Sequence, residues 1–160
     1  MNKSYLTAIA RKTLPVPVRW LLQQGNAIQG HVLDFGCGKC KEINDRTIAQ
    51  LPVVKSMTSF DPFYAPHKFT IFEQFDTILC TYVLCALPLK EGLKILKVVQ
   101  SLLSLDGMAF ISVRNDKPKW GHGVSSRGTF QRRVKLPTLR VIHKTSQFRI
   151  YMLTKNSHLT

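Results

Sequence analysis

Residues 31–39, His-Val-Leu-Asp-Phe-Gly-Cys-Gly-Lys, constrain the fold of this chain more than any other segment. The apolar residues predict a short strand that runs to Asp34 and turns at once through Gly36 and Gly38. Because glycine has no Cβ, such a turn lets the backbone approach a bound ligand closely. An ordinary tight turn after a strand is the alternative. The segment favours a nucleoside-cofactor site at the end of this strand.

Strands and helices alternate along the middle of the chain, as in a parallel sheet covered by helices. Apolar periodicity predicts helices at 16–24, 41–51 and 89–104, and strands at 31–35, 53–60, 75–83 and 108–113. A loop is expected at 115–128, and strands at 130–136, 139–144 and 148–155, the last two as a hairpin over 145–147. A chain of 160 residues has room for one domain. We expect a single α/β domain with an N-terminal basic arm and helix (1–30), a cofactor-binding core (31–113) and a basic loop with C-terminal strands (114–160).

The spacing Asp34-x-Gly36-x-Gly38 resembles the first motif of the class I S-adenosylmethionine (SAM) methyltransferases. Three later parts of the chain also resemble motifs of this family: Asp61 at the end of the second expected strand, residues 75–84, and residues 103–111. The resemblance implies a Rossmann-like, mostly parallel sheet with antiparallel C-terminal strands, and SAM as the cofactor. Within the family, the pattern is most similar to small phage and bacterial members found near DNA-modification genes.

The resemblance also assigns roles to individual residues. It implies that Asp61 accepts hydrogen bonds from the ribose hydroxyls of SAM and that Asp34 orients the methionine end. Asp61 could instead cap the turn before Pro62. Phe63 and Tyr64 either stack on adenine or pack in the core. The residues expected to contact the cofactor are Asp34, Phe35, Gly36, Cys37, Gly38, Asp61, Pro62, Cys80, Thr81 and Tyr82.

Two features depart from the family pattern. Cys40 stands where the turn usually has a third glycine. Only fourteen residues separate Asp61 from Asp76, too few for the helix, strand and helix that family members place there. We therefore expect a minimal class I methyltransferase fold in which the third-strand region is reduced or missing.

Methyl transfer depends mostly on positioning, and the chain shows no catalytic triad, no Asn/Asp-Pro-Pro-Tyr tetrad and no Pro-Cys nucleophile. Tyr82 and Asp116, which follow neighbouring strand ends, are the candidate catalytic residues. Asp116 could take a proton from an incoming amine or hydroxyl, or could pair with a neighbouring Arg or Lys. Cys37-x-x-Cys40 lacks a second cysteine pair or a histidine cluster, so no metal site is expected. The four cysteines are interpreted as reduced thiols.

The net charge of +14 is unevenly distributed. Residues 1–30 hold four basic residues and no acid, residues 31–111 hold eight of each, and residues 112–160 hold eleven basic residues and one acid. This concentration favours a polyanionic partner, most simply DNA or RNA, over a basic face that only aids solubility. The residues expected to contact nucleic acid are Arg11, Lys12, Arg114, Arg127, Phe130, Arg132 and Arg133.

Three hypotheses for function follow. The first is a SAM-dependent methyltransferase acting on nucleic acid, and the second is the same enzyme acting on a small molecule or a protein. The third is a non-catalytic nucleic-acid-binding module on a degenerate methyltransferase scaffold. The N-terminus lacks a secretory signal and no apolar run approaches the length of a membrane span, so a cytoplasmic location is expected. The sequence leaves open the acceptor atom, DNA versus RNA, and a protein partner or a homo-oligomer.

Overall fold

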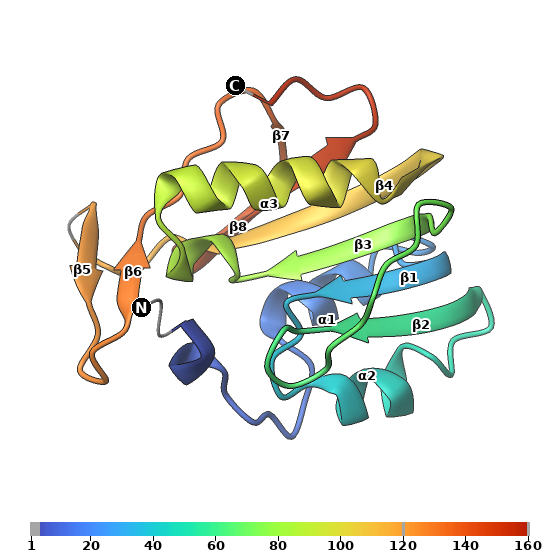
Figure 1. Ribbon diagram of the computed structural model, residues 1–160, viewed down its shortest axis with the longest axis horizontal. Coiled ribbons are helices and arrows are strands. Elements are labelled where there is room, and N and C mark those ends of the chain that lie inside the picture. Colours follow the sequence, from blue (N-terminus) through green and yellow to red (C-terminus); the bar gives the residue numbers. More distant parts are fainter. Residues whose placement is uncertain (1–3, 120, 160) are drawn as a thin grey trace.

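The computed structural model of the protein describes residues 4–119 and 121–159. Its centre is a six-stranded sheet with the strand order β2-β1-β3-β4-β8-β7 (Figure 1). The strands are β1 (Gly30–Phe35), β2 (Val54–Phe60), β3 (Phe75–Thr81), β4 (Leu103–Arg114), β7 (Arg140–Lys144) and β8 (Phe148–Thr154). Strands β1 to β4 are parallel, and β8 runs antiparallel to both of its neighbours. The predicted fold class is confirmed.

Burial along each strand follows its position in the sheet. β3 lies between β1 and β4, and the consecutive residues Ile78, Leu79 and Cys80 are all buried, although they alternate between the two faces. Helices cover both faces of a central parallel strand, which explains its continuous apolar run. β2 is an edge strand and exposes Lys55 and Ser56 to solvent. A lysine on an edge strand disfavours pairing with another chain.

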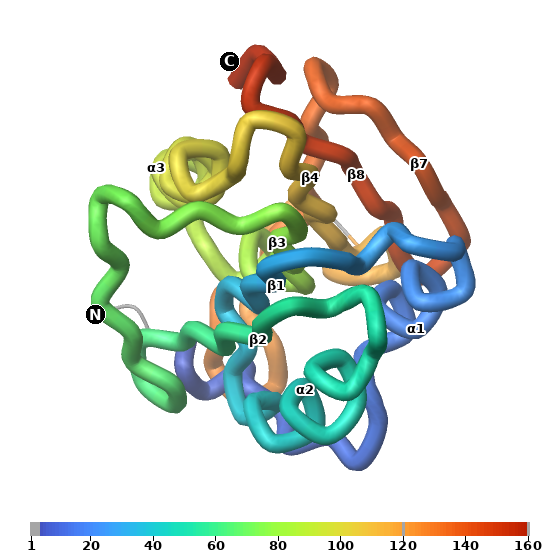
Figure 2. The backbone as a smooth tube through the Cα atoms, turned by 90° about the vertical axis from the view of Figure 1, so that its right-hand side faces the viewer, coloured from blue at the N-terminus to red at the C-terminus, as the bar shows by residue number. Residues whose placement is uncertain are grey.

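Helices cover both faces of the sheet (Figure 2). α1 (Val16–Leu22) and α2 (Lys41–Thr47) lie on one face, and α3 (Leu89–Ser101) lies on the other. α1 buries Val18 and Leu21 in one core cluster, and α3 buries Leu96 and Val99 in a second. Each helix begins where the sequence predicts and ends two to four residues earlier. Among the described residues, no helix is both long and apolar enough to cross a membrane.

The third-strand region is missing, as the short spacing between β2 and β3 predicts. Residues 61–74, all of which the structure describes, form a loop that contains no strand of the sheet. The loop lies on the same side of the sheet as α3 (Figure 2). There the ring of Phe69 packs against Phe35 and Phe60, with centroids 6.4 and 5.0 Å away. A half-buried aromatic side chain of this loop therefore packs on the ends of β1 and β2.

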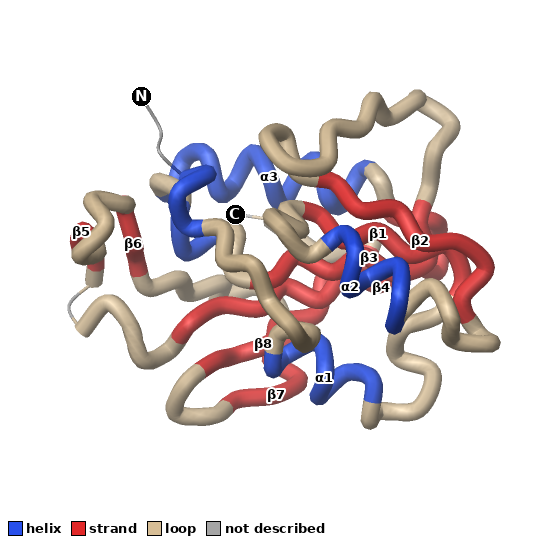
Figure 3. Tube along the Cα trace, turned by 90° about the horizontal axis from the view of Figure 1, so that it is seen from below, coloured by secondary structure: helices blue, strands red, loops and turns tan. Residues whose placement is uncertain are grey.

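The basic C-terminal third contains a ribbon that the sequence does not predict. β5 (His122–Val124) forms inside the expected 115–128 loop and pairs antiparallel with β6 (Phe130–Arg132). This β5–β6 ribbon stands apart from the main sheet (Figure 3). β6 is shorter than the expected strand at 130–136, because Val134 and Leu136 leave the ribbon and pack into the core cluster beneath α3.

The other C-terminal expectations are met more closely. The predicted hairpin forms between β7 and β8, and the Thr145 amide donates to the Phe148 carbonyl over 2.8 Å. β4 begins at Leu103 instead of at the expected Met108, because Leu103 already pairs with Phe75 before a register shift in the ladder. Gly107 lies within β4, and a Cβ there would be 2.7 Å from the Phe75 carbonyl oxygen. Gly107 thus permits the close approach of β3 and β4.

Candidate functional site

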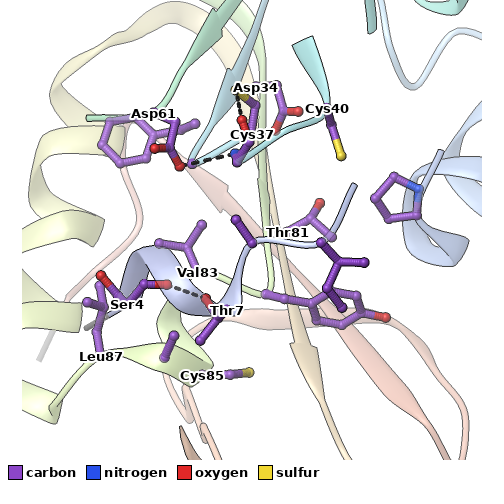
Figure 4. A pocket seen from close by; sticks show the side chains of 18 of the residues that line it. Ser4, Thr7, Asp34, Cys37, Cys40, Asp61, Thr81, Val83, Cys85 and Leu87 are labelled. Carbon is purple, nitrogen blue, oxygen red and sulfur yellow. Dashed lines mark hydrogen bonds between the residues drawn. The ribbon is translucent and has the colours of Figure 1, made fainter. Parts of the chain in front are cut away.

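A cavity of about 770 Å³ opens at the carboxyl ends of β1, β2 and β3. Its lining includes the turn after β1, residues 60–63, the segment after β3, and the N-terminal residues 4–11 with their 3₁₀ turn Ser4–Thr7 (Figure 4). Single residues from the start of α1, from α3 and from the C-terminal third complete it. Open parallel sheets bind ligands at this edge. The cavity volume also falls in the usual range for small-molecule sites.

The glycine turn after β1 forms one wall of the cavity. Gly36 and Gly38 have φ angles of 80° and 54°, which glycine adopts at little cost. The amides of Gly36 and Cys37 both donate to the Phe60 carbonyl, over 2.7 and 2.9 Å, and fix the turn on the end of β2. A Cβ on Gly36 would lie 2.3 Å from Cγ2 of Val83. The turn therefore needs glycine for both its conformation and its close packing.

Asp61 caps the turn, which is one of the two roles that the sequence left open, and it also lies on the cavity wall. Its Oδ1 accepts hydrogen bonds from the amides of Phe63 and Tyr64, over 2.9 and 3.1 Å, and so caps the turn. Its Oδ2 accepts one from the amide of Gly38 over 3.1 Å, and the residue also lines the cavity (Figure 4). A carboxylate has about four acceptor sites. Asp61 therefore retains acceptor capacity on the side of Oδ2 for a ligand.

Asp34 is a buried carboxyl that faces the same cavity (Figure 4). Its Oδ2 accepts a hydrogen bond from the side chain of Asn44 over 2.6 Å. Burial raises the pKa of the Asp34 carboxyl to about 6; the Asn44 hydrogen bond lowers that pKa and the nearby Asp61 carboxylate raises it. Sequence reasoning missed Asn44. The pattern that could have identified it is a polar residue between the apolar Ile43 and Ile48, on the side of α2 that is buried.

The cysteines occupy different positions around the site. Cys37 and Cys40 line the cavity, whereas Cys80 is completely buried in the core cluster beneath α3. Cys80 was expected to contact the cofactor, but it is fully buried in β3, between β1 and β4, and does not line the cavity. Burial raises the pKa of the Cys37 thiol to about 12 and also raises the pKa of Cys80. Both thiols therefore stay protonated and are poor nucleophiles.

The candidate catalytic residues, Tyr82 and Asp116, both line the cavity. Tyr82 has a φ angle of 64°, a strained conformation for a bulky residue. Asp116 forms a two-point ion pair with Arg114, with Oδ1 3.0 Å from Nε and Oδ2 2.7 Å from Nη2. The hydrogen bonds from Arg114 lower the pKa of Asp116. Of the two roles considered for Asp116, the structure shows the pairing, and the lowered pKa makes this carboxylate a weaker proton acceptor.

The residues expected to contact nucleic acid separate into three groups. Arg11 and Arg114 line the cavity. Lys12, Arg127 and Arg133 are exposed to solvent outside it. Phe130 and Arg132 are half-buried on β6, and Arg132 points inward, where its Nε donates to the Leu87 carbonyl over 2.6 Å. Arg132 therefore has a structural contact that the sequence did not predict, while its neighbour Gln131 lines the cavity without having been expected to.

The N-terminal segment covers the cavity instead of extending as a free arm. Tyr5 packs against Phe63 with ring centroids 5.3 Å apart, and the Tyr64 hydroxyl donates to the Tyr5 carbonyl over 3.0 Å. Ala8 lies over the glycine turn, 3.1 Å from the position of a Cβ on Gly38. Phe63 remains 56% exposed, so the core-packing alternative for this ring does not hold.

No protein-family model matches the chain, and no curated protein sequence is significantly similar to it. Solved structures do resemble it. A Burkholderia thailandensis 1,6-didemethyltoxoflavin-N1-methyltransferase, bound to its substrate and S-adenosylhomocysteine, gives a TM-score of 0.64 at 14% identity over 94% of this chain and 77% of that chain. This chain has the class I methyltransferase fold.

Two other structures support the same assignment of the fold. The DhpI-SAM-HEP complex gives a TM-score of 0.60 at 13% identity over 85% of this chain and 83% of that chain. A SAM-dependent methyltransferase from Clostridium acetobutylicum gives 0.53 at 11% identity over 85% and 87%. Fold alone does not determine function, which depends on the residues of the site.

Proposed function

We propose that the chain is a SAM-dependent methyltransferase. The observation that carries this proposal is the cavity at the carboxyl ends of the parallel strands, with the Gly36–Gly38 turn and two carboxylates in its wall. SAM carries positive charge on its sulfonium and ammonium groups, which suits a wall containing Asp34 and Asp61. When bound, SAM supplies a methyl group that a nucleophile attacks, while the C–S electron pair returns to sulfur and leaves a neutral thioether.

Each part of the chain has a role in this proposal. The free acceptor site of Asp61 suits a ribose hydroxyl, because a carboxylate accepts from donors held in a fixed geometry. Asp34 suits the ammonium group of the methionine end, since a buried carboxylate gains most from a positive partner. The exposed ring of Phe63 borders the cavity and offers a face for adenine.

The chain's own contribution to catalysis would be positioning and the exclusion of water. Asp116, the only acid after residue 111, is paired with Arg114 and is not free to act as a base. The N-terminal segment 4–11 and the aromatic residues it contacts close one side of the cavity. A methyl group held there in a dry, fixed orientation needs a well-placed nucleophile more than it needs a proton relay.

Two acceptor classes are proposed, each on a different observation. Nucleic acid is supported by the basic termini and by Lys12, Arg127 and Arg133, which are exposed to solvent. A small molecule is supported by the cover over the cavity. It is also supported by the names of structural neighbours such as the didemethyltoxoflavin N1-methyltransferase and the mitomycin 7-O-methyltransferase MmcR, the latter with a TM-score of 0.51. The narrower likeness to DNA-modification-associated members, and the cytoplasmic location, remain predictions.

The decisive experiment is calorimetric titration of the purified protein with SAM. The wild-type protein should bind, and Asp61→Asn should weaken binding at least about tenfold, because one charged acceptor is lost. Asp61→Asn keeps an oxygen to cap the turn, and circular dichroism would verify its fold. Asp45→Ala is the matched control, since Asp45 lies on α2 outside the cavity and pairs with Lys41. A folded wild-type protein that binds no SAM would instead support the non-catalytic nucleic-acid-binding module.

A further inference from the structure

The cavity has opposite charges at its two ends. Asp61 follows β2 and Asp34 lies on β1, whereas Tyr82 follows β3 and Arg114 ends β4. The strand order β2-β1-β3-β4 places Asp61 and Arg114 three strand positions apart. At about 4.8 Å per strand this separation is about 14 Å. An acidic end and a basic end therefore lie along one continuous cavity.

Hydrogen-bond donors dominate the basic end. Burial raises the pKa of the Tyr82 hydroxyl, whereas the charges of Arg11 and Arg114 act to lower it, so both arginines lie near that hydroxyl. The cavity lining also includes Asp116, Gln131 and Gln147. Asp116 is the one carboxylate in this set, and it occupies Nε and Nη2 of Arg114, which leaves Nη1 of that guanidinium available. Within the described residues, Arg11 makes no hydrogen bond or ion pair. Two arginines against one carboxylate leave this end with a net positive charge.

We propose that the basic end, formed by Arg11, Tyr82 and Arg114, binds an oxyanion, a phosphate group carried by the methyl acceptor. A guanidinium presents planar paired donors that match such groups. The Arg114 side chain is 34% exposed, and this partial burial strengthens the interaction by lowering the local dielectric. The inference rests on the proposed function, in which the acidic end takes the cationic methyl donor, and it deepens that function by giving the acceptor the opposite charge.

Asp116 has a defined role in this arrangement, as a competitor for Arg114. An oxyanion that enters must share the guanidinium with the Asp116 carboxylate, whose two contacts measure 3.0 and 2.7 Å. Asp116→Asn should therefore strengthen oxyanion binding, because it removes the competing negative charge and keeps the shape. A purely structural Asp116 would predict the opposite result, since losing the ion pair would loosen Arg114 and weaken binding.

The phosphate could belong to a small molecule or to a nucleic-acid backbone, and two probes distinguish these sources. The protein would first be saturated with S-adenosylhomocysteine, so that only the acceptor end stays free. Phenyl phosphate represents a small acceptor, and a single-stranded oligonucleotide of mixed sequence represents a polymer. Affinity for each would be measured by calorimetry, which reports binding without requiring methyl transfer. Binding of the oligonucleotide alone would assign the oxyanion to a nucleic-acid backbone.

The expected result is that Arg114→Gln and Arg11→Gln each weaken binding of the bound probe at least about tenfold. Arg140→Gln is the matched control, because Arg140 is exposed on β7 and does not line the cavity. Unchanged affinity in both cavity variants, or no binding of either probe by the wild-type protein, would overturn the proposal even if S-adenosylhomocysteine binds. Failure of S-adenosylhomocysteine to bind, with arginine-dependent probe binding intact, would instead count against the methyltransferase function.

Discussion

Asp34 is a buried carboxyl whose ionisation costs folding stability. Burial raises its pKa to about 6, which corresponds to about 3 kcal/mol of lost stability when the carboxyl is ionised. Asp34→Asn should remove much of this cost at neutral pH, since an amide oxygen can still accept the hydrogen bond from Asn44. The same substitution should weaken SAM binding at least about tenfold by removing the negative charge. Urea denaturation and calorimetry would measure the two effects.

The pH dependence of this variant provides a second check on the same residue. An unfolded aspartate loses its proton near pH 4, whereas Asp34 in the folded protein keeps it up to a pKa of about 6. The folded state therefore binds more protons between these values, and wild-type stability falls as pH rises through this window. The stability of Asp34→Asn should lack that fall. Equal pH profiles for the two proteins would show that Asp34 is not buried as described.

The left-handed glycines provide a matched pair of substitutions at the same scale. Gly36→Ala places a Cβ 2.3 Å from Val83 at a φ of 80°, whereas Gly25→Ala meets nothing within 4 Å at a φ of 62°. Both variants carry the strain of a positive φ, about 1 kcal/mol. Gly36→Ala should lose further stability and should lose SAM affinity, because the turn must shift. Thermal denaturation that finds the two variants equally destabilised would contradict the close packing of the turn.

At the scale of elements, Arg132 holds the β5–β6 ribbon against the segment that follows β3. Its Nε donates to Leu87 over 2.6 Å, and its Nη2 lies 2.8 Å from the position of a Cβ on Gly92. Leu87 lines the cavity, so this hydrogen bond links the ribbon to the cavity wall. Arg132→Met should remove the link, and amide hydrogen exchange across residues 122–132 should increase. Arg133→Met is the control, since the Arg133 side chain is exposed and its Nε donates to the carbonyl oxygen of Pro118 instead of Leu87. Equal exchange in the two variants would show that Arg132 does not hold the ribbon in place.

The elements of the sheet could be predicted because their signals are local. The apolar run of β3, the spacing of Leu96 and Val99 on α3, and the few residues between β2 and β3 are all visible in the sequence. The position of the N-terminal segment 4–11 over the cavity could not be predicted. Tyr5 belongs to no periodic apolar pattern, and its contact with Phe63 joins segments that are distant in the sequence. Cys80 does not line the cavity because it is fully buried one residue before the end of β3, and a strand-end pattern does not show at which residue the strand emerges from the core.

At the scale of the whole molecule, the neutral charge of residues 31–111 conceals the separation of charge within the cavity. The acids at one end come from β1 and the end of β2, and the arginines at the other end come from the N-terminal segment and the end of β4. The sequence groups Arg11 and Arg114 with Arg127 and Arg133 as basic residues of the two terminal segments. The fold instead brings these two to one cavity and leaves Arg127 and Arg133 outside it.

That separation allows general electrostatic attraction to be told apart from a specific surface for nucleic acid. The affinity for a single-stranded oligonucleotide should fall with salt, with a slope that decreases by about 0.7 for each phosphate contact removed. Replacing both Arg127 and Arg133 by Gln should therefore lower the slope by about 1.4. Replacing Lys94 and Lys97, which are exposed on α3, removes the same charge and should leave the slope unchanged. Equal losses in the two double variants would mean that net charge, and no defined surface, attracts the nucleic acid.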